Sequence, residues 1–414
     1  MAGTPRRGVR TARPVLRSPA LRDGGWTSRP YLFKIACCRI CIKVDFGLGS
    51  PSRLWLNLRV RRNSKSTSSR PHRKRRGGWR WLLVLTVLAA AAWFWWRHEH
   101  PAKAVRAPVK AVVPRLQPFV VAPESPADFP RPVRDVFEAQ MALARRAISS
   151  GPIDAALGSQ TRRAISVYQE TQHLPVTGTL NADTRARLTL AAPLVTTYVV
   201  TAADLARLQP LGKTWLAKSQ QTALDFETEL ELVAEKSHSH PELIRRLNLG
   251  VNWTNIAAGT ALKVPDLDYP AVSNKAAFAV IHLADKFLEA FDMETNLLAH
   301  FPCSIAAHVE KRPVGELHVV VVAPNPNYTV DPELFPESAE LQAIGHKLIL
   351  PPGPNNPVGV AWIGLDKTGY GIHGTPIPEQ VGRTESHGCF RLANWDAEYL
   401  GKLVWVGMPV FIEP

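Results

Sequence analysis

Acidic residues are almost absent from the beginning of this 414-residue chain. The first 80 positions hold 21 Lys and Arg against only Asp23 and Asp45, whereas the whole chain has 50 basic and 35 acidic residues and a formal net charge of +15. The remaining residues therefore carry 29 basic and 33 acidic side chains. A nucleic-acid-binding protein needs its basic surface on a folded domain, so this distribution argues against DNA or RNA as a partner. The length alone favours several domains.

Cysteine is also scarce, which leaves little material for metal sites or disulfides. Three of the five cysteines, Cys37, Cys38 and Cys41, lie together with His72 as the only histidine nearby, too few ligands for a metal site. Residues 1–78 are rich in Arg, Pro and Ser, a composition that predicts a disordered basic tail on the cytoplasmic side. The alternative is a start assigned too early, although Met does not recur between Met1 and Met141.

The segment after this tail has few polar residues and no acidic ones. Residues 79–96 read WRWLLVLTVLAAAAWFWW, about the length of a helix that spans a bilayer. Tryptophans gather at both ends, and basic residues precede the segment, as the positive-inside rule requires for a cytoplasmic N-terminus. The sequence therefore predicts a single-pass anchor in the cytoplasmic membrane, with the rest of the chain in the periplasm or cell envelope. A cleaved signal peptide is the competing interpretation, because 102–104 has the A-x-A form.

A proline-rich linker and a helical unit follow. Residues 97–132 contain eight prolines, which predicts an extended spacer. Residues 133–192 show three runs with helical spacing of apolar residues, separated by glycine-bearing turns, and Asn181 stands where an N-cap would begin the third helix.

This unit resembles the three-helix peptidoglycan-binding domain. Eight residues occur in the order typical of that family: Gln140, Asp154, Gly158, Thr161, Tyr168, Gln169, Gly178 and Thr184. Ala155 is a departure, because the family usually has glycine there. A helical spacer without a ligand is the alternative.

Residues 198–268 resemble a LysM repeat at both ends. YVVTAADLARL opens the segment, and a helix-like run, a Leu247-Asn248 turn and Gly259 before a short strand close it. The insert LGKTWLAKSQQTALDFE interrupts the pattern. A helical connector between two better-defined domains is the alternative.

From residue 275 onward the pattern changes to short β-rich runs divided by polar turns, which predicts a mostly-β domain. Asn394 stands where a cap would begin a short helix through DAEYLGKL.

Two motifs in this last domain carry the chemistry, IHGT at 372–375 and SHGCFRL at 386–392. A reactive cysteine needs a basic partner, because the thiolate is the nucleophile and a free thiol is mostly protonated near neutral pH. His373 can take the proton of Cys389 and return it to a leaving amine. Gly388 favours a tight turn whose N–H groups meet an oxyanion, and Arg391 suits a substrate carboxylate.

These motifs make residues 275–414 similar to the L,D-transpeptidase (YkuD-type) catalytic family, together with KRPVGELHV, LPPGPNNPVG and GYGIHGTP upstream. The resemblance implies that Cys389 is the nucleophile and His373 its base, oriented by the Gly374 carbonyl. It further implies that four residues shape the acyl site: Ser386, His387, Gly388 and Arg391. No metal or organic cofactor is implied.

The implied reaction begins on a peptidoglycan tetrapeptide stem. Cys389 would attack the carbonyl of the third residue and expel the terminal D-Ala. A neighbouring stem amine would then take the acyl group to form a 3→3 cross-link, or an amine-bearing partner would take it and become attached to the wall. Water as acceptor would make the site a carboxypeptidase, and a wall-binding tether with an idle catalytic domain is a third hypothesis. A zinc site from His373, His387 and Cys389 is chemically possible. A Cys303–Cys389 disulfide is conceivable, but Cys303 is predicted to fill the core.

Together these patterns predict a multidomain protein. Its catalytic domain is mostly β, sandwich-like with a short helix. An all-α three-helix domain, an α/β LysM-like segment and one transmembrane helix precede it.

Overall fold

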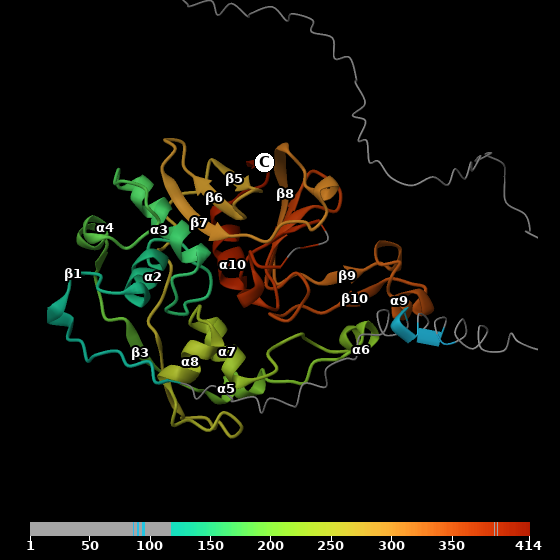
Figure 1. Ribbon diagram of the computed structural model, residues 1–414, viewed down its shortest axis with the longest axis horizontal. Helices are drawn as coiled ribbons and strands as arrows, with labels where there is room; N and C mark the ends of the chain where they lie inside the picture. Colours follow the sequence, from blue (N-terminus) through green and yellow to red (C-terminus); the bar gives the residue numbers. More distant parts are fainter. Residues whose placement is uncertain (1–85, 87–88, 91–92, 96–116, 385, 387) are drawn as a thin grey trace, which may run out of the picture. The chain divides into compact units, whose positions relative to one another are not determined.

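The structure is a computed structural model that describes residues 86, 89–90, 93–95, 117–384, 386 and 388–414. The chain divides into two units, Met1–Arg106 and Ala107–Pro414, and the fold below is that of the second (Figure 1). The predicted disordered tail, residues 1–78, lies outside the described residues, as does the linker up to residue 116.

The prediction of a transmembrane helix over 79–96 is corrected. Among the described residues, no helix is long and apolar enough to cross a membrane, which takes about 20 mostly apolar residues. The described positions of this segment, 86, 89–90 and 93–95, are helical, and its other positions lie outside the described residues. The expected single-pass membrane location falls with this helix.

Three helices form the first domain of the second unit, as predicted. They are α2 (Val136–Ala144), α3 (Ser159–Thr171) and α4 (Ala182–Arg187). The Asn181 side chain accepts the Thr184 N–H and caps α4, which confirms that prediction. The domain is not purely helical, because the chain after α4 forms β2 (Thr189–Leu190), which pairs antiparallel with β1 (Arg131–Pro132).

Two buried glutamines hold the turns between these helices. The Gln140 amide bonds the backbone of residues 154–156 and the Thr161 hydroxyl. The Gln169 amide does the same for residues 177–179 and Thr184. Buried amides need partners for both ends, and each turn supplies them. Several of the family-like residues are therefore explained by the fold alone.

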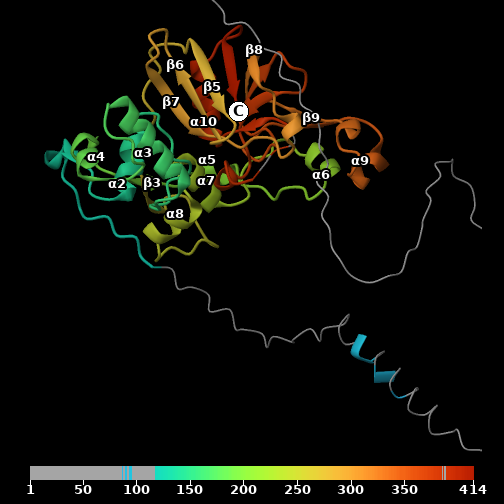
Figure 2. The same ribbon diagram turned by 45° about the horizontal axis from the view of Figure 1, so that its top comes forward.

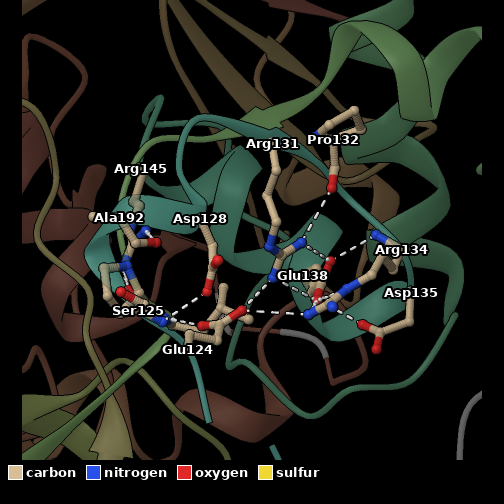
Figure 3. A network of polar contacts seen from close by, with 12 residues as sticks. Glu124, Ser125, Asp128, Arg131, Pro132, Arg134, Asp135, Glu138, Arg145 and Ala192 are labelled. Carbon is tan, nitrogen blue, oxygen red and sulfur yellow. Dashed lines mark hydrogen bonds and ion pairs between the residues drawn. The ribbon is translucent and has the colours of Figure 1, made fainter. Parts of the chain in front are cut away.

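An ion-pair network fixes the start of α2 to the chain that enters it (Figure 3). The Glu138 carboxylate, 3% exposed, accepts from Arg131 at 2.8 Å and from Arg134 at 2.6 Å. Glu124 pairs with the same two arginines. Burial opposes ionisation of Glu138, but the hydrogen bonds from Arg131 and Arg134 outweigh it and lower its pKa. The end of the proline-rich linker is thus part of the folded unit.

Residues 195–265 form a second small domain. Its two strands, β3 (Val195–Val199) and β4 (Ala261–Pro265), pair antiparallel along their whole length. Four helices lie between them in the chain: α5 (Ala202–Ala206), α6 (Trp215–Ser219), α7 (Glu229–Lys236) and α8 (Pro241–Leu247). A core that includes Phe226, Leu232, Ile244 and Leu262 joins these elements.

The third domain is built on one sheet of eight strands in the order β13-β12-β11-β8-β14-β5-β6-β7. The strands are β5 (Phe278–His282), β6 (Phe287–Phe291), β7 (Leu297–Pro302), β8 (Gly315–Pro324), β11 (Ala361–Leu365), β12 (Gly371–His373), β13 (Phe390–Arg391) and β14 (Pro409–Glu413). The predicted strands are confirmed. A single sheet replaces the expected sandwich-like arrangement, because β14 pairs with both β5 and β8 and so joins the two halves.

Helix α10 (Asn394–Leu403) covers this sheet (Figure 2). Its Ala397 and Leu400 are buried in the same core as Ile281, Val319 and Ile363. Burial of a leucine, isoleucine or valine side chain is worth about 1.5–3 kcal/mol. The helix begins soon after β13 ends, and it contacts β12.

A short excursion leaves the sheet between β8 and β11. It contains β9 (Tyr328–Val330), β10 (Leu348–Leu350) and α9 (Ala339–Ile344), and β9 pairs antiparallel with β10. Leu224 of the second domain shares a buried cluster with Val330 and Leu350. Helix α6 lies beside this excursion in both ribbon views (Figures 1 and 2). The insert in the second domain therefore packs on the third domain.

Ala155 has φ +62°, a left-handed conformation that costs an L-residue about 1–2 kcal/mol and glycine little. We expect Ala155→Gly to raise the free energy of unfolding of the first, helical domain by about 1 kcal/mol. The measurement is urea denaturation of the full chain. Ala142→Gly in the interior of α2 is the control and should lower the free energy of unfolding by at least about 1 kcal/mol, because it loses both helix propensity and a buried methyl group. A lower urea midpoint for Ala155→Gly would contradict this assignment of strain.

Candidate active site

The two motifs meet at one edge of the eight-stranded sheet. Strands β12 and β13 pair in parallel, with Ile372 opposite Phe390 and His373 opposite Arg391. Cys389 directly precedes β13, so it lies beside the start of β12. Its sulfur donates to the Gly369 carbonyl at 3.4 Å, and a backbone hydrogen bond from Gly371 favours its ionised form. The strand pairs and this hydrogen bond thus join residues that are 18 and 20 positions apart in the sequence.

The His373 imidazole is buried, with 4% of the residue exposed. Its Nδ1 lies 2.6 Å from the Gly374 carbonyl oxygen. Because a carbonyl only accepts, Nδ1 carries the proton and Nε2 keeps a free lone pair. Trp362 stacks on the ring at a centroid distance of 5.6 Å. Burial lowers the pKa of His373 to about 4, so the ring is neutral near pH 7 and its lone pair is on Nε2.

The Cys389 thiol is partly exposed. Burial raises the pKa of this thiol, while the Gly371 N–H and the Arg391 charge act in the opposite direction. The raised thiol pKa and the lowered imidazole pKa both favour a neutral pair over a thiolate–imidazolium pair. Among the bonds of the described residues, none joins the Cys389 sulfur to the His373 ring.

Ser386 holds the loop before Cys389. Its N–H donates to the Ile305 carbonyl at 2.8 Å. Its hydroxyl donates to the Cys389 carbonyl and accepts the Gly388 N–H at 3.2 Å. The Gly388 N–H, expected to meet an oxyanion, is thus engaged by Ser386 in this state. A Cβ at Gly388 would meet no atom within 4 Å, so the protein's own packing does not require glycine there.

Arg391 lies within electrostatic range of both Cys389 and Tyr328, and burial lowers its pKa. Arg391 is the arginine that the sequence predicted for this site, and it lies among the described residues. His387 lies outside the described residues, so its predicted role, and the zinc set that includes it, stay predictions. The structure places Cys389, His373, Gly374, Ser386, Gly388 and Arg391 together at the β12–β13 edge.

Cys303 is fully buried in the core of the third domain, as predicted. Burial raises the pKa of its thiol far above the ordinary value. Both Cys303 and Cys389 are free, so the alternative disulfide between them is absent.

One residue near the site, Tyr328, was missed by sequence interpretation, and another, Asn394, was given the wrong role. Tyr328 begins β9. Burial, followed by the charge of Cys389, raises its pKa, and the charge of Arg391 acts in the opposite direction. Asn394 was predicted to cap α10, but Ala393 is the N-cap and makes no side-chain cap bond. The Asn394 side chain instead accepts the Thr375 N–H at 2.9 Å. Its oxygen cannot serve both purposes, which is why the cap prediction is wrong.

Comparison with known proteins agrees with this geometry. Residues 276–412 match the family model "L,D-transpeptidase catalytic domain", and residues 133–188 match "Putative peptidoglycan binding domain". The third domain is an L,D-transpeptidase catalytic domain of the YkuD type, and the first domain belongs to the peptidoglycan-binding domains.

Three relatives illustrate the similarity. "Putative L,D-transpeptidase YkuD" of Bacillus licheniformis is 25% identical over 45% of this chain and 93% of its own length. "Probable L,D-transpeptidase YbiS" of Escherichia coli is 30% identical over 39% of this chain and 53% of its own length. "Putative L,D-transpeptidase YqjB" of Bacillus subtilis is 37% identical over 24% and 51%. The chain thus spans about half the length of the last two.

Among solved structures, L,D-transpeptidase 3 from Mycobacterium tuberculosis is 17% identical, over 39% of this chain and 77% of that one. Its TM-score of 0.27 is too low to support a conclusion.

The neutral pair leads to a test of thiol reactivity. We expect alkylation of Cys389 by iodoacetamide to accelerate about tenfold per pH unit without a plateau below about pH 8.5, because only the thiolate reacts. The rate is measured by peptide mass spectrometry on the native full chain. Cys303, fully buried, should remain unlabelled in the same sample and serves as the control. A plateau at neutral pH would show a preformed thiolate and contradict the neutral pair.

Proposed function

We propose that the chain is a peptidoglycan L,D-transpeptidase with Cys389 as nucleophile and His373 as general base. The observation that carries the proposal is the orientation of the His373 ring: its Nδ1 is held by the Gly374 carbonyl, and its strand pairs with the strand that follows Cys389. A base needs a free lone pair near the proton that it removes, and Nε2 has one. Gly374 acts through its carbonyl, which orients the ring.

The proposed reaction proceeds in two steps with the proton conserved. His373 Nε2 removes the Cys389 proton as the sulfur attacks the carbonyl of the third stem residue. The tetrahedral intermediate collapses, the bond to D-Ala breaks, and the imidazolium returns the proton to the leaving amine. An amine of a second stem then attacks the thioester, loses its proton to His373 and releases the thiol. The product is a 3→3 cross-link.

The remaining predicted residues have supporting roles in this proposal. Arg391 would bind a substrate carboxylate or an oxyanion, because its fixed fork suits both. Ser386 and Gly388 would set the shape of the acyl site, and His387 would complete it. No metal or organic cofactor takes part.

The other domains would bring the site to its polymer. We propose a helical domain over 133–192 that binds peptidoglycan, a LysM-like domain over 198–268 and a catalytic domain over 275–414. The antiparallel β3–β4 pair with α7 and α8 between its strands supports the LysM-like proposal. Transfer of the acyl group to water, a carboxypeptidase reaction, is the second candidate function, because Cys389 is partly exposed to solvent.

A product assay tests this proposal. The full chain is incubated with a disaccharide-tetrapeptide muropeptide, and the products are identified by liquid chromatography and mass spectrometry. We expect release of D-Ala and formation of a cross-linked dimer, both lowered at least about 10³-fold by Cys389→Ala. Cys303→Ala is the control and should remain active. Equal D-Ala release by Cys389→Ala and the parent would contradict the proposal, and a tripeptide without dimer would favour the carboxypeptidase.

A further inference from the structure

Helix α7 of the second domain presents two carboxylates to the catalytic domain. Glu231 and Glu235 are one turn apart, so they lie on the same face of the helix. Glu231 accepts from the Asn355 side chain at 2.5 Å, and Glu235 accepts from the Asn394 side chain at 2.7 Å. Each carboxylate therefore holds an asparagine of the domain that carries the active site.

The contact is a built interface rather than two isolated bonds. The Leu224 N–H donates to the Pro352 carbonyl, and the Asn355 N–H donates to the Leu224 carbonyl, both at 2.9 Å. A Cβ at Gly353 would collide with the Leu224 backbone. The second domain thus contacts the loop over 351–359 through backbone hydrogen bonds of Leu224 and through the side chain of Glu231 in α7.

Asn394 connects Glu235 to the backbone beside the active site. It is 1% exposed, and a Cβ at either Gly359 or Gly374 would collide with its side-chain oxygen. That oxygen accepts the Thr375 N–H at 2.9 Å and the Val360 N–H at 3.3 Å. The nitrogen donates to Glu235 and, at 3.2 Å, to the Pro354 carbonyl. Donors on one side and acceptors on the other fix the orientation of the amide.

The Thr375 N–H belongs to the peptide bond that also contains the Gly374 carbonyl. That carbonyl holds the Nδ1 proton of His373. A rotation of this peptide plane would move the N–H and the carbonyl together, because the peptide bond is planar. Asn394 and His373 therefore bond to the two ends of the same peptide group.

We propose that Glu235 is a positioning residue for the transpeptidase site. From the second domain it holds Asn394, which holds the 374–375 peptide, which holds the catalytic imidazole. The inference rests on the proposed function of His373 as the base. It makes the LysM-like domain a structural part of the active site as well as a candidate wall-binding module.

Burial disfavours the charged form of Glu235 at this contact. Burial raises its pKa to about 8, the Asn394 bond opposes that change, and Glu231 and Glu379 add to it. Arg207 provides a weaker attraction. Near pH 7 Glu235 is therefore mostly a neutral acid whose carbonyl oxygen accepts from Asn394. Glutamine offers a neutral acceptor oxygen of the same reach, so Glu235→Gln should preserve the positioning.

The test compares kcat and KM for D-Ala release by the full chain and four variants. Glu235→Leu removes the acceptor and should lower kcat about tenfold with little change in KM, because a small displacement of a catalytic group is costly. Glu235→Asp retracts the carboxylate and should lower kcat less, a second variant in case leucine prevents folding. Glu235→Gln should stay within about twofold of the parent.

Glu231→Leu is the matched control. It removes the neighbouring contact of the same helix face without touching Asn394, so the thermal midpoint should fall while kcat stays within about twofold. Equal loss of kcat in Glu231→Leu and Glu235→Leu would overturn the proposal in favour of general loosening of the interface. Parent-like kcat in both Glu235→Leu and Glu235→Asp would also overturn it.

A second readout does not depend on activity. Nitrogen-15 NMR of labelled histidines, with the His373 signal assigned by His373→Gln, reports which ring nitrogen carries the proton. We expect the Nδ1–H form in the parent, Glu235→Gln and Glu231→Leu, and a mixture of tautomers in Glu235→Leu and Glu235→Asp. An unchanged tautomer in Glu235→Leu and Glu235→Asp would overturn the positioning role, whether or not the parent releases D-Ala. Failure of the parent to release D-Ala would contradict the proposed function, which is a separate result.

Discussion

The active site depends on one pair of short strands at the edge of the sheet. Parallel pairing of β12 with β13 brings the IHGT and SHGC motifs together and sets their register through two residue pairs. A slip of one residue in either strand would turn its side chains to the opposite face, so His373 and Cys389 would no longer share a side. The bridge between Ser304 and Arg391 and the one between Ala306 and Ser386 secure β13 and its loop from the other side. Sheet register is thus a condition for the chemistry.

Around this edge, segments from all three domains support the loops that carry the reactive groups. The Gln160 side chain of the helical domain donates to the Val381 carbonyl at 2.6 Å, in the loop that leads to Ser386. Leu224 of the second domain packs with the excursion that contains Tyr328, and α7 reaches Asn394. Proton transfer from the Cys389 thiol to the His373 imidazole requires a short and constant distance between the two groups.

The sequence predicted the local features well, because each depends on a few neighbouring residues. The motifs at 372–375 and 386–392, the strands of the third domain and the Asn181 cap are of this kind. Asn394 shows the limit: its neighbours favour a cap, but Thr375 and Val360, brought in by the fold, take its oxygen. Glu235 and Tyr328 gain their positions only through contacts with segments far along the chain, which no local pattern records. The anchor prediction relied on composition and length alone, and the sandwich prediction could not foresee that β14 joins two groups of strands.

Formation of a thioester on Cys389 is the central claim, and intact-mass spectrometry tests it most directly. The full chain is mixed with a tetrapeptide stem donor in the absence of an acceptor amine and quenched in acid. The account predicts a mass gain equal to the donor without its terminal D-Ala, located on the peptide that contains Cys389 and absent from Cys389→Ala. D-Ala release from a protein whose mass stays unmodified, or an adduct on another residue, would contradict it.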